Sequence, residues 1–547
     1  MSRTRSTPAR PLHHPTVFEP LTFVLIVALS AFGALIGLHL ITTLGISANT
    51  SVIGALLAML LGRVSILGLS KMRSIHRQNL TQSAISAATF AAANALLTPI
   101  AIPFAFGRPD LVWPMLIGSA AGLMIDIWVL YRAFDSAFLP ATGTWPPGVA
   151  AAETILAGDR GGRRALILAG GAVVGVVGAF AGLAMSAAGV ALIGNMWALL
   201  MFGVGLFVNQ YGPGLFDVDL TALYIPHGVM IGAGLVALGQ AIHLLVGRRS
   251  AKAAARAAAT ASKAGQPAVE EVEPGRPTVD PARLRRAFGE GFALFVLGAV
   301  LLAVLSGLWA DMSPMALIGW VLFAGFAALV HEIIVGLAAM HAGWFPAFAV
   351  TLIFLVFGLL VGIPTVPLVL LTAYTATTGP AFADMGYDLK AGWMLRREEQ
   401  NTAFELAGRR QQYLASAIGC LVALGMVALL WRSFLEGGSI PPVATVYADT
   451  IKAGLGADGV LTNMLIWAVP GALIQLIGGS RRQMGVLLAT GLLVGSVNAC
   501  WLVFAALLGR VIYRRVRGAA ADQELSLVGA GLIAGDSVAA TAQVLRS

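Results

Sequence analysis

The sequence predicts an all-α fold, a polytopic bundle of transmembrane helices with about 14–16 membrane segments in two homologous halves. Two observations carry this prediction. Apolar blocks of about 20 residues, long enough to cross a bilayer as a helix, recur along the whole chain. Hydrophobic residues make up 58% of the 547 positions and charged residues only 11%, whereas a soluble domain carries about 25% charged residues. So few charges cannot cover a water-soluble body of this size, and lipid is the expected solvent.

The apolar blocks give the expected helices in chain order. Block 165–208 has room for two spans, with a turn expected near Gly189, and block 366–378 is short. We expect about two or three of the blocks to be re-entrant or broken. The first half contains blocks 21–44, 52–69, 80–106, 111–131, 165–208 and 220–246, and the second contains 288–309, 315–340, 344–361, 366–378, 414–431, 461–477, 484–508 and 525–545.

A basic stretch separates the halves and sets the expected topology. Residues 248–286 have no apolar face and contain nine Lys or Arg residues, so the positive-inside rule places them in the cytoplasm. Residues 1–20 form a basic cytoplasmic tail, and the block after them is too long for a signal-peptide core. The transmembrane halves are then 21–247 and 287–547. The tail and the linker both lie in the cytoplasm, so an even number of spans must separate them. The blocks of the first half give seven spans, and a further crossing element is therefore expected near 146–156.

The sequence argues against several function classes. The net charge of +9 comes from basic residues placed between apolar blocks, so a nucleic-acid partner is not expected. Cys420 and Cys500 lie in apolar stretches and are expected to be free buried thiols rather than metal ligands. His331-Glu332 lacks the second His that a zinc motif places on the same helix face. The sequence has no Walker-type phosphate loop either, so we expect no metal or cofactor and no ATP-driven pump.

Two patterns indicate how helices pair. The sequences AETILAGDRGGRRALILAGG and TAFELAGRRQQYLASAIG both run from Leu-Ala-Gly through an Arg pair into an apolar block, as expected of an internal repeat. Gly171 with Gly175, and Gly178 with Gly182, follow the GxxxG spacing that lets two helices approach closely.

Ionisable side chains inside apolar blocks are candidate functional groups, because burying a charge in a bilayer is costly. Arg63 lies near a block end, where snorkelling to the surface is the simplest role. Asp126 and Asp536 fit a structural partner of a polar group as well as a functional group. His331 and Glu332 are adjacent, and the imidazole can either carry protons or make a hydrogen-bonded helix contact. The full set of candidates is Arg63, Asp126, His227, His331, Glu332 and Asp536.

Polar segments interrupted by Pro or Gly are a second kind of candidate. Such segments leave backbone groups unpaired within the membrane, where transporters hold their solutes, although each also fits an ordinary loop or kinked helix. Three segments qualify, at 79–103, 144–153 and 375–390. Their candidate binding residues are Asn79, Gln82, Ser83, Pro146, Gly148, Glu153, Thr377, Thr378, Asp384, Asp388 and Lys390.

Four segments, taken in order, resemble the signatures of the oligopeptide transporter (OPT) family. NLTQSAISAATFAAANALLTPIAIP resembles its Asn-x-x-Gln-Thr/Ser-x-x-Ser segment, and TWPPGVAAAETILAG its Ala-rich Ala-Glu-x-x-x-Ala-Gly segment. YDLKAGWML followed by GRRQQ resembles its Asp-Leu-Lys-x-Gly and Arg-Arg-Gln-Gln signature, and GAGLIAGDSVAA its terminal Gly-Leu-Ile-Ala-Gly-Glu-Ser motif. Pro147 stands where the family has Glu and Asp536 replaces another Glu, so the chain looks like a divergent, bacterial-type member.

The resemblance implies a secondary transporter rather than an enzyme. It implies a multi-pass cell-membrane protein that imports short oligopeptides by proton-coupled symport or, as in the yellow-stripe-like branch, metal complexes of siderophore- or nicotianamine-like chelators. The partners would be this solute, protons and membrane lipid, and the oligomeric state is left open. Peptide ends carry opposite charges, so Lys390 with Asp384 or Asp388 are the expected charge partners. The expected proton-coupling residues are His227, His331, Glu332 and Asp536.

Two rivals come from other classes. A membrane-embedded enzyme acting on lipid-linked substrates would need a carboxylate pair or metal ligands at the membrane surface, and Asp217 with Asp219 is the close pair of that kind. Turnover of a lipid substrate would favour it. A passive channel or scaffold is the other rival, and absence of accumulation against a gradient would favour that one.

Overall fold

The structure is a computed structural model that describes most of the chain. Four parts of the chain lie outside the described residues: residues 52–68 of the expected span 52–69, Arg63 within it, residues 1–12, and the linker up to residue 276. The described residues are 13–43, 69–160, 162–220, 223–246, 277–343, 345, 347–399, 401–454, 460–493, 498–518 and 521–544.

Within these ranges the chain is helical, with one isolated bridge between Ser136 and Val279 and no strand. The all-α prediction is confirmed. The helices before the linker are α1 (Pro20–Thr43), η1 (Leu69–Arg73), α3 (Ile75–Phe90), η2 (Ala91–Leu97), α4 (Thr98–Phe106), η3 (Pro109–Leu111), α5 (Val112–Ala133), α6 (Pro146–Arg160), α7 (Gly162–Phe180), α8 (Met185–Ile193), α9 (Met196–Phe216) and α10 (Ile225–Val246).

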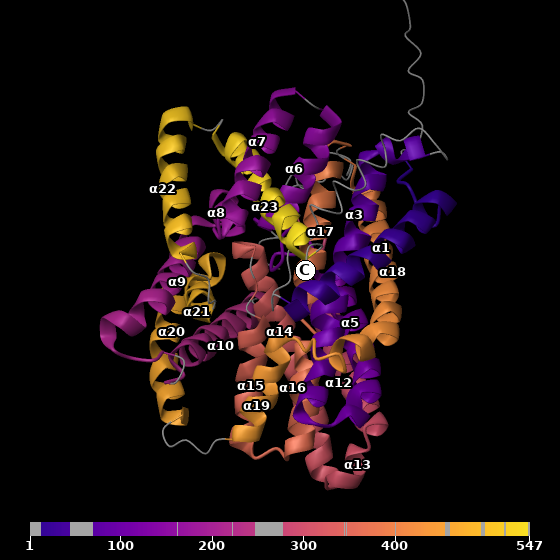
Figure 1. Ribbon diagram of the computed structural model, residues 1–547, viewed down its shortest axis with the longest axis vertical. Coiled ribbons are helices and arrows are strands. Elements are labelled where there is room, and N and C mark those ends of the chain that lie inside the picture. The colour runs from indigo at the N-terminus through magenta and orange to yellow at the C-terminus, as the bar shows by residue number, and fades with distance from the viewer. Residues whose placement is uncertain are drawn as a thin grey trace, which may run out of the picture.

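The helices after the linker complete the bundle. Figure 1 shows helices such as α18 and α22 along the long axis and others such as α10 and α23 oblique to it, with α13 at one end and the α6–α7 and α22–α23 junctions at the other. These helices are α12 (Pro281–Leu305), α13 (Leu308–Asp311), α14 (Pro314–Ala342), α15 (Ala347–Val361), α16 (Thr365–Ala376), α17 (Pro380–Arg396), η4 (Arg397–Glu399), α18 (Thr402–Leu435), α19 (Pro442–Ala453), α20 (Val460–Arg482), α21 (Met484–Leu493), α22 (Ala499–Arg517) and α23 (Ala521–Val544).

Nine helices in the described part of the chain are long and apolar enough to cross a membrane. Their outer faces carry large apolar side chains; on α7, Leu166 is 73% exposed and Val177 is 64% exposed. A soluble monomer does not leave such a surface in water, so lipid covers it. The nine are Pro20–Thr42, Ile75–Phe106, Pro109–Ala133, Gly162–Phe180, Pro281–Leu305, Pro314–His341, Thr365–Arg396, Thr402–Leu435 and Thr462–Gly479.

Several helix boundaries differ from the expected ones. The turn predicted near Gly189 is wrong, because Gly189 lies inside α8. The chain turns instead at Gly182, where φ is 77°, and at Asn195, whose side chain caps α9. The crossing element predicted near 146–156 is helix α6, whose 15 residues are fewer than the roughly 20 of a full span. The short block 366–378 continues through a break into α17, giving one broken span of 32 residues.

Close glycine contacts join the two predicted halves of the chain. Cβ atoms added at Gly171 and Gly175 on α7 would lie 3.1 and 3.0 Å from the Cα atoms of Gly531 and Gly535 on α23. The close approach expected of the first GxxxG pair is therefore confirmed. The second pair makes no such crossing, because its first glycine packs on Met185 and its second ends α7 in a left-handed turn.

Helices α10 and α20 pack equally tightly, and this contact yields a stability prediction. A Cβ added at Gly232 of α10 would overlap the carbonyl oxygen of Ala468. Gly232→Ala is expected to destabilise the fold by about 1–3 kcal/mol through overpacking and to lower the melting temperature in detergent. Gly239→Ala is the matched control on the same helix, where an added Cβ meets nothing within 4 Å. Equal melting temperatures for the two variants would contradict the close crossing.

Candidate functional site

Two buried carboxylates on α17 form the centre of the candidate site. Asp384 and Asp388 are one helical turn apart, so they share a face of α17, and both are fully buried. The Ser86 hydroxyl of α3 donates to Asp384 over 2.5 Å. The side-chain amide of Gln82, also on α3, donates to Asp388. The first and third polar segments predicted from the sequence therefore meet inside the bundle.

Side-chain amides extend this cluster to a third helix. The Asn79 amide donates to Gln82 over 3.1 Å. Gln412 of α18 donates to the Ser83 hydroxyl over 3.1 Å and to the backbone oxygen of Asp388 over 2.7 Å. Ser86 and Gln412 were missed as candidates, although both lie within the quoted motifs. We call the set the polar column: Asn79, Gln82, Ser83, Ser86, Asp384, Asp388 and Gln412.

An ion-pair network closes one end of the polar column. Arg396, at the end of α17, is fully buried; it donates to Gln412 over 2.8 Å and to Glu405 over 2.7 Å. Arg409 lies 3.2 Å from Glu405 and 3.5 Å from Asp135. Guanidinium groups at this depth are stable because each has a carboxylate or amide partner.

The residues before α1 pack against this same end. The His14 ring lies 5.2 Å from the rings of His76 and Phe404, and the Val17 N–H donates to Gln411 over 2.9 Å. Burial lowers the pKa of His14 to about 4, so its ring is neutral at pH 7. A neutral ring fits beside the Arg396 guanidinium.

The break between α16 and α17 lies next to the polar column, in the 375–390 segment. Gly379 has a φ of 86°, a left-handed conformation that glycine adopts without strain. The Asp126 carboxylate of α5 accepts the N–H groups of Gly379 and Phe382 over 3.0 and 2.8 Å. It therefore caps α17, where a negative charge is favoured by the helix dipole.

The hydroxyl groups of the two threonines at the break form hydrogen bonds within the protein. The Thr377 hydroxyl donates to the backbone oxygen of Tyr374 over 2.7 Å. The Thr378 hydroxyl lies 3.1 Å from the backbone oxygen of Ala328 and from His331 Nδ1. Their contacts hold the break in place.

His331 and Glu332 of α14 reach the same break in different ways. His331 Nε2 lies 3.0 Å from the backbone oxygen of Ala347 and 3.1 Å from the Thr351 hydroxyl. Since Nδ1 contacts Thr378, both ring nitrogens have partners. Glu332 is fully buried, and its carboxyl group interacts with that of Asp126. Among the described residues no N–H donor reaches either of its oxygens.

Lys390 lies on the face of α17 opposite to Asp388. Two helical residues turn the chain by about 200°, so Lys390 points away from the side of Asp388. Its ammonium group donates to the backbone oxygen of Ala141 over 2.8 Å and lies 4.6 Å from the Trp393 ring centre. The structure therefore separates the expected cationic and anionic partners.

The 144–153 segment packs on this second face as helix α6. A Cβ added at Gly148 would lie 2.9 Å from Lys390 Cβ, so the missing side chain lets α6 touch α17. Pro146 contacts Gly343, at the end of α14. Glu153 is buried further along α6.

The remaining candidates lie on other helices. His227, in the first turn of α10, is buried with its ring 5.4 Å from that of Tyr224. Asp536 of α23 accepts the N–H of Ser186 over 3.1 Å and so caps α8. Asp217 and Asp219 are exposed in the connection after α9.

Charged and amide side chains buried along a broken helix are the features by which membrane transporters hold solutes. The fold and the polar column together define a multi-pass membrane transporter. The family model described as OPT oligopeptide transporter protein matches residues 20–247 and 176–543, and the chain belongs to this family. No curated protein and no solved structure matches the chain.

Proposed function

We propose that the protein is a secondary active transporter that imports short oligopeptides across the cell membrane together with protons. One observation carries the proposal. The polar column has two carboxylates towards one end, side-chain amides along it and the Arg396 guanidinium at the other end. A peptide has a cationic amino end, amide groups and an anionic carboxyl end, which match these groups in order.

The spacing of the charges favours a particular peptide length. Arg396 lies eight residues after Asp388 and twelve after Asp384, or about 12 and 18 Å along a helix. An extended chain covers about 3.4 Å per residue. Peptides of about three to five residues can therefore reach from a carboxylate to the guanidinium. Arg396 fits the carboxyl end better than Lys390 does, because Lys390 projects from the other face of α17.

The distribution of basic residues supports an orientation. The residues before α1 and the end of the linker both contact the Arg396 end, the latter through a 3.0 Å bond between Arg409 and Thr278. The α6–α7 and α22–α23 junctions lie at this end (Figure 1) and are joined by the ion pair of Arg163 with Glu524, at 2.8 Å. Further basic residues gather there, which the positive-inside rule assigns to the cytoplasm: Arg164, Arg514, Arg515 and Arg517.

Uptake into proteoliposomes tests both the cargo and the coupling. An inward proton gradient is expected to drive accumulation of a labelled tripeptide above its external concentration. Unlabelled peptides of two to eight residues serve as competitors, with the strongest inhibition expected at about three to five residues. Stronger inhibition by iron, nickel or copper chelates would instead identify the cargo as a metal complex. Uptake that is indifferent to the pH gradient would contradict proton coupling.

A further inference from the structure

The carboxyl groups of Asp126 and Glu332 meet outside the polar column. Their contact joins α5 to α14 beside the break between α16 and α17. Both side chains are fully buried, and their carboxyl groups interact with each other. Asp126 also receives the N–H groups of Gly379 and Phe382, whereas Glu332 receives no N–H group among the described residues.

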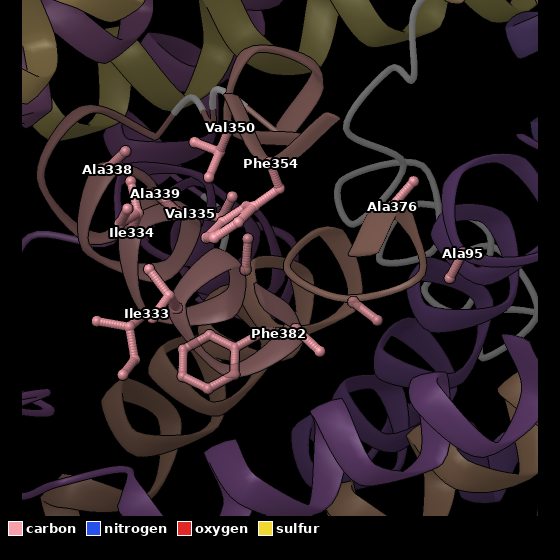
Figure 2. Close-up of a cluster of buried hydrophobic side chains, with 14 of the residues drawn as sticks. Ala95, Ile333, Ile334, Val335, Ala338, Ala339, Val350, Phe354, Ala376 and Phe382 are labelled. Atoms are coloured by element: carbon pink, nitrogen blue, oxygen red, sulfur yellow. The ribbon is translucent and has the colours of Figure 1, made fainter. Parts of the chain in front are cut away.

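Apolar side chains are buried on the helices that hold the pair and the break. Figure 2 shows Ile333, Val335 and Phe382 on α14 and α17 among the buried side chains of this region. Lys390 lies on the other face of α17, and Arg396 is more than four turns from the break. Two adjacent carboxylates so far from a cation repel each other when both are charged, because each charge adds to the cost of burying the other. A hydrogen bond between two carboxyl groups needs one shared proton, and that proton removes the repulsion.

The neighbouring titratable groups already have other partners or are neutral. His331 has both ring nitrogens engaged, Tyr374 donates to the backbone oxygen of Phe295 over 2.9 Å, and Asp384 accepts from Ser86. Cys420 contributes a buried thiol. At the ends of the helices packed on α5, the charged groups pair with one another: Arg132 with Glu290, and Arg409 with Glu405 and Asp135.

We infer that Asp126 and Glu332 together form the proton-coupling site of the transporter. The inference rests on the proposed proton-driven uptake and names the groups that carry the proton. His331 becomes a positioning residue, because Nδ1 ties α14 to the break at Thr378, Nε2 ties it to α15 at Ala347 and Thr351, and no ring nitrogen is left for a travelling proton. His227 and Asp536 lie on helices outside the contact.

The geometry gives a mechanism for coupling. With one proton on the pair, Glu332 donates to Asp126 while Asp126 caps α17. When that proton leaves, two carboxylates face each other, and their repulsion pushes α14 away from the cap. Asp126 caps α17 at Gly379, and Asp384 lies only five residues after Gly379. A movement of the break therefore displaces the carboxylates of the polar column, and solute and proton are released together.

Two assays on the same proteoliposomes test the inference. Gradient-driven accumulation needs proton coupling, whereas exchange of labelled for unlabelled tripeptide without a gradient needs only the solute site. Glu332→Gln keeps the shape and removes the proton. It is expected to reduce gradient-driven accumulation at least about tenfold, equivalent to about 1.4 kcal/mol, while exchange continues. Asp126→Asn, which keeps an oxygen for the cap, is expected to behave in the same way.

The controls separate the possible failures. Glu436→Gln makes the same chemical change at a side chain that is 58% exposed and is expected to retain both activities. His331→Gln is expected to lower both activities without altering how uptake varies over about pH 5–8, the range in which a free histidine would titrate. Gradient-driven accumulation in Glu332→Gln equal to that of wild type would overturn the inference. If wild type itself ignores the gradient, the proposed function fails first.

Discussion

Asp384→Asn and Asp388→Asn are each expected to reduce tripeptide uptake by about 30-fold or more. Either change removes the negative charge that would pair with the amino group of a bound peptide. Truncating one partner of a buried charge pair costs about 2 kcal/mol or more, which corresponds to about 30-fold in affinity. Initial uptake rates at a fixed, low peptide concentration measure the loss.

The fold should survive these two changes, which makes the result interpretable. Asparagine keeps the side-chain size and the oxygen that accepts from Ser86 or Gln82, so the melting temperature in detergent should change little. Asp449→Asn is the matched control, because Asp449 is 65% exposed. A second comparison uses a tripeptide with an acetylated amino end. Wild type should discriminate strongly between the free and acetylated peptides, and a variant that still discriminates would refute the assignment.

The sequence predicts much of the fold and the burial of the column because the solvent is lipid. In an apolar span, a polar side chain must turn inwards, so Asn79, Gln82 and Ser83 could be assigned to the interior from their positions alone. The same argument places Asp384 and Asp388 there. The structure confirms that all five are buried. Their roles in binding stay predictions.

Other parts of the site depend on packing that the sequence pattern does not contain. Gln412 joins the column only because α18 lies against α3, which brings it to Ser83, 329 positions away in the chain. Asp126 likewise meets Glu332 only because the fold brings these two side chains, 206 positions apart in the chain, to the same break. The misplaced turn near Gly189 has a simpler cause, since that stretch offers several glycines and helix packing decides which of them ends a helix. The separation of Lys390 from Asp388 was predictable, because their spacing already puts them on opposite faces of a helix.

Glu405→Gln is expected to give the largest loss of stability, about 3–5 kcal/mol. Glu405 is the carboxylate nearest to Arg396, at 2.7 Å, and also pairs with Arg409. The change removes the negative charge that compensates the fully buried Arg396, and in the described part of the chain this guanidinium then has only neutral amide oxygens, such as that of Gln412, as side-chain acceptors. Breaking a buried pair from one side carries a penalty of this size because a buried charge remains uncompensated. Thermal unfolding in detergent measures the loss.

The double variant Arg396→Met with Glu405→Gln separates the structural from the functional role of Arg396. Removing both charges eliminates the uncompensated cation, and Arg409 keeps Asp135 at 3.5 Å, so much of the lost stability should return. Tripeptide uptake should not return, because the proposed partner of the peptide carboxylate is gone. A double variant as unstable as Glu405→Gln would show that unpaired charge is not the cause of the loss. A stable double variant that transports like wild type would show that Arg396 closes this end of the bundle without touching the solute, and the peptide carboxylate would then have to bind elsewhere.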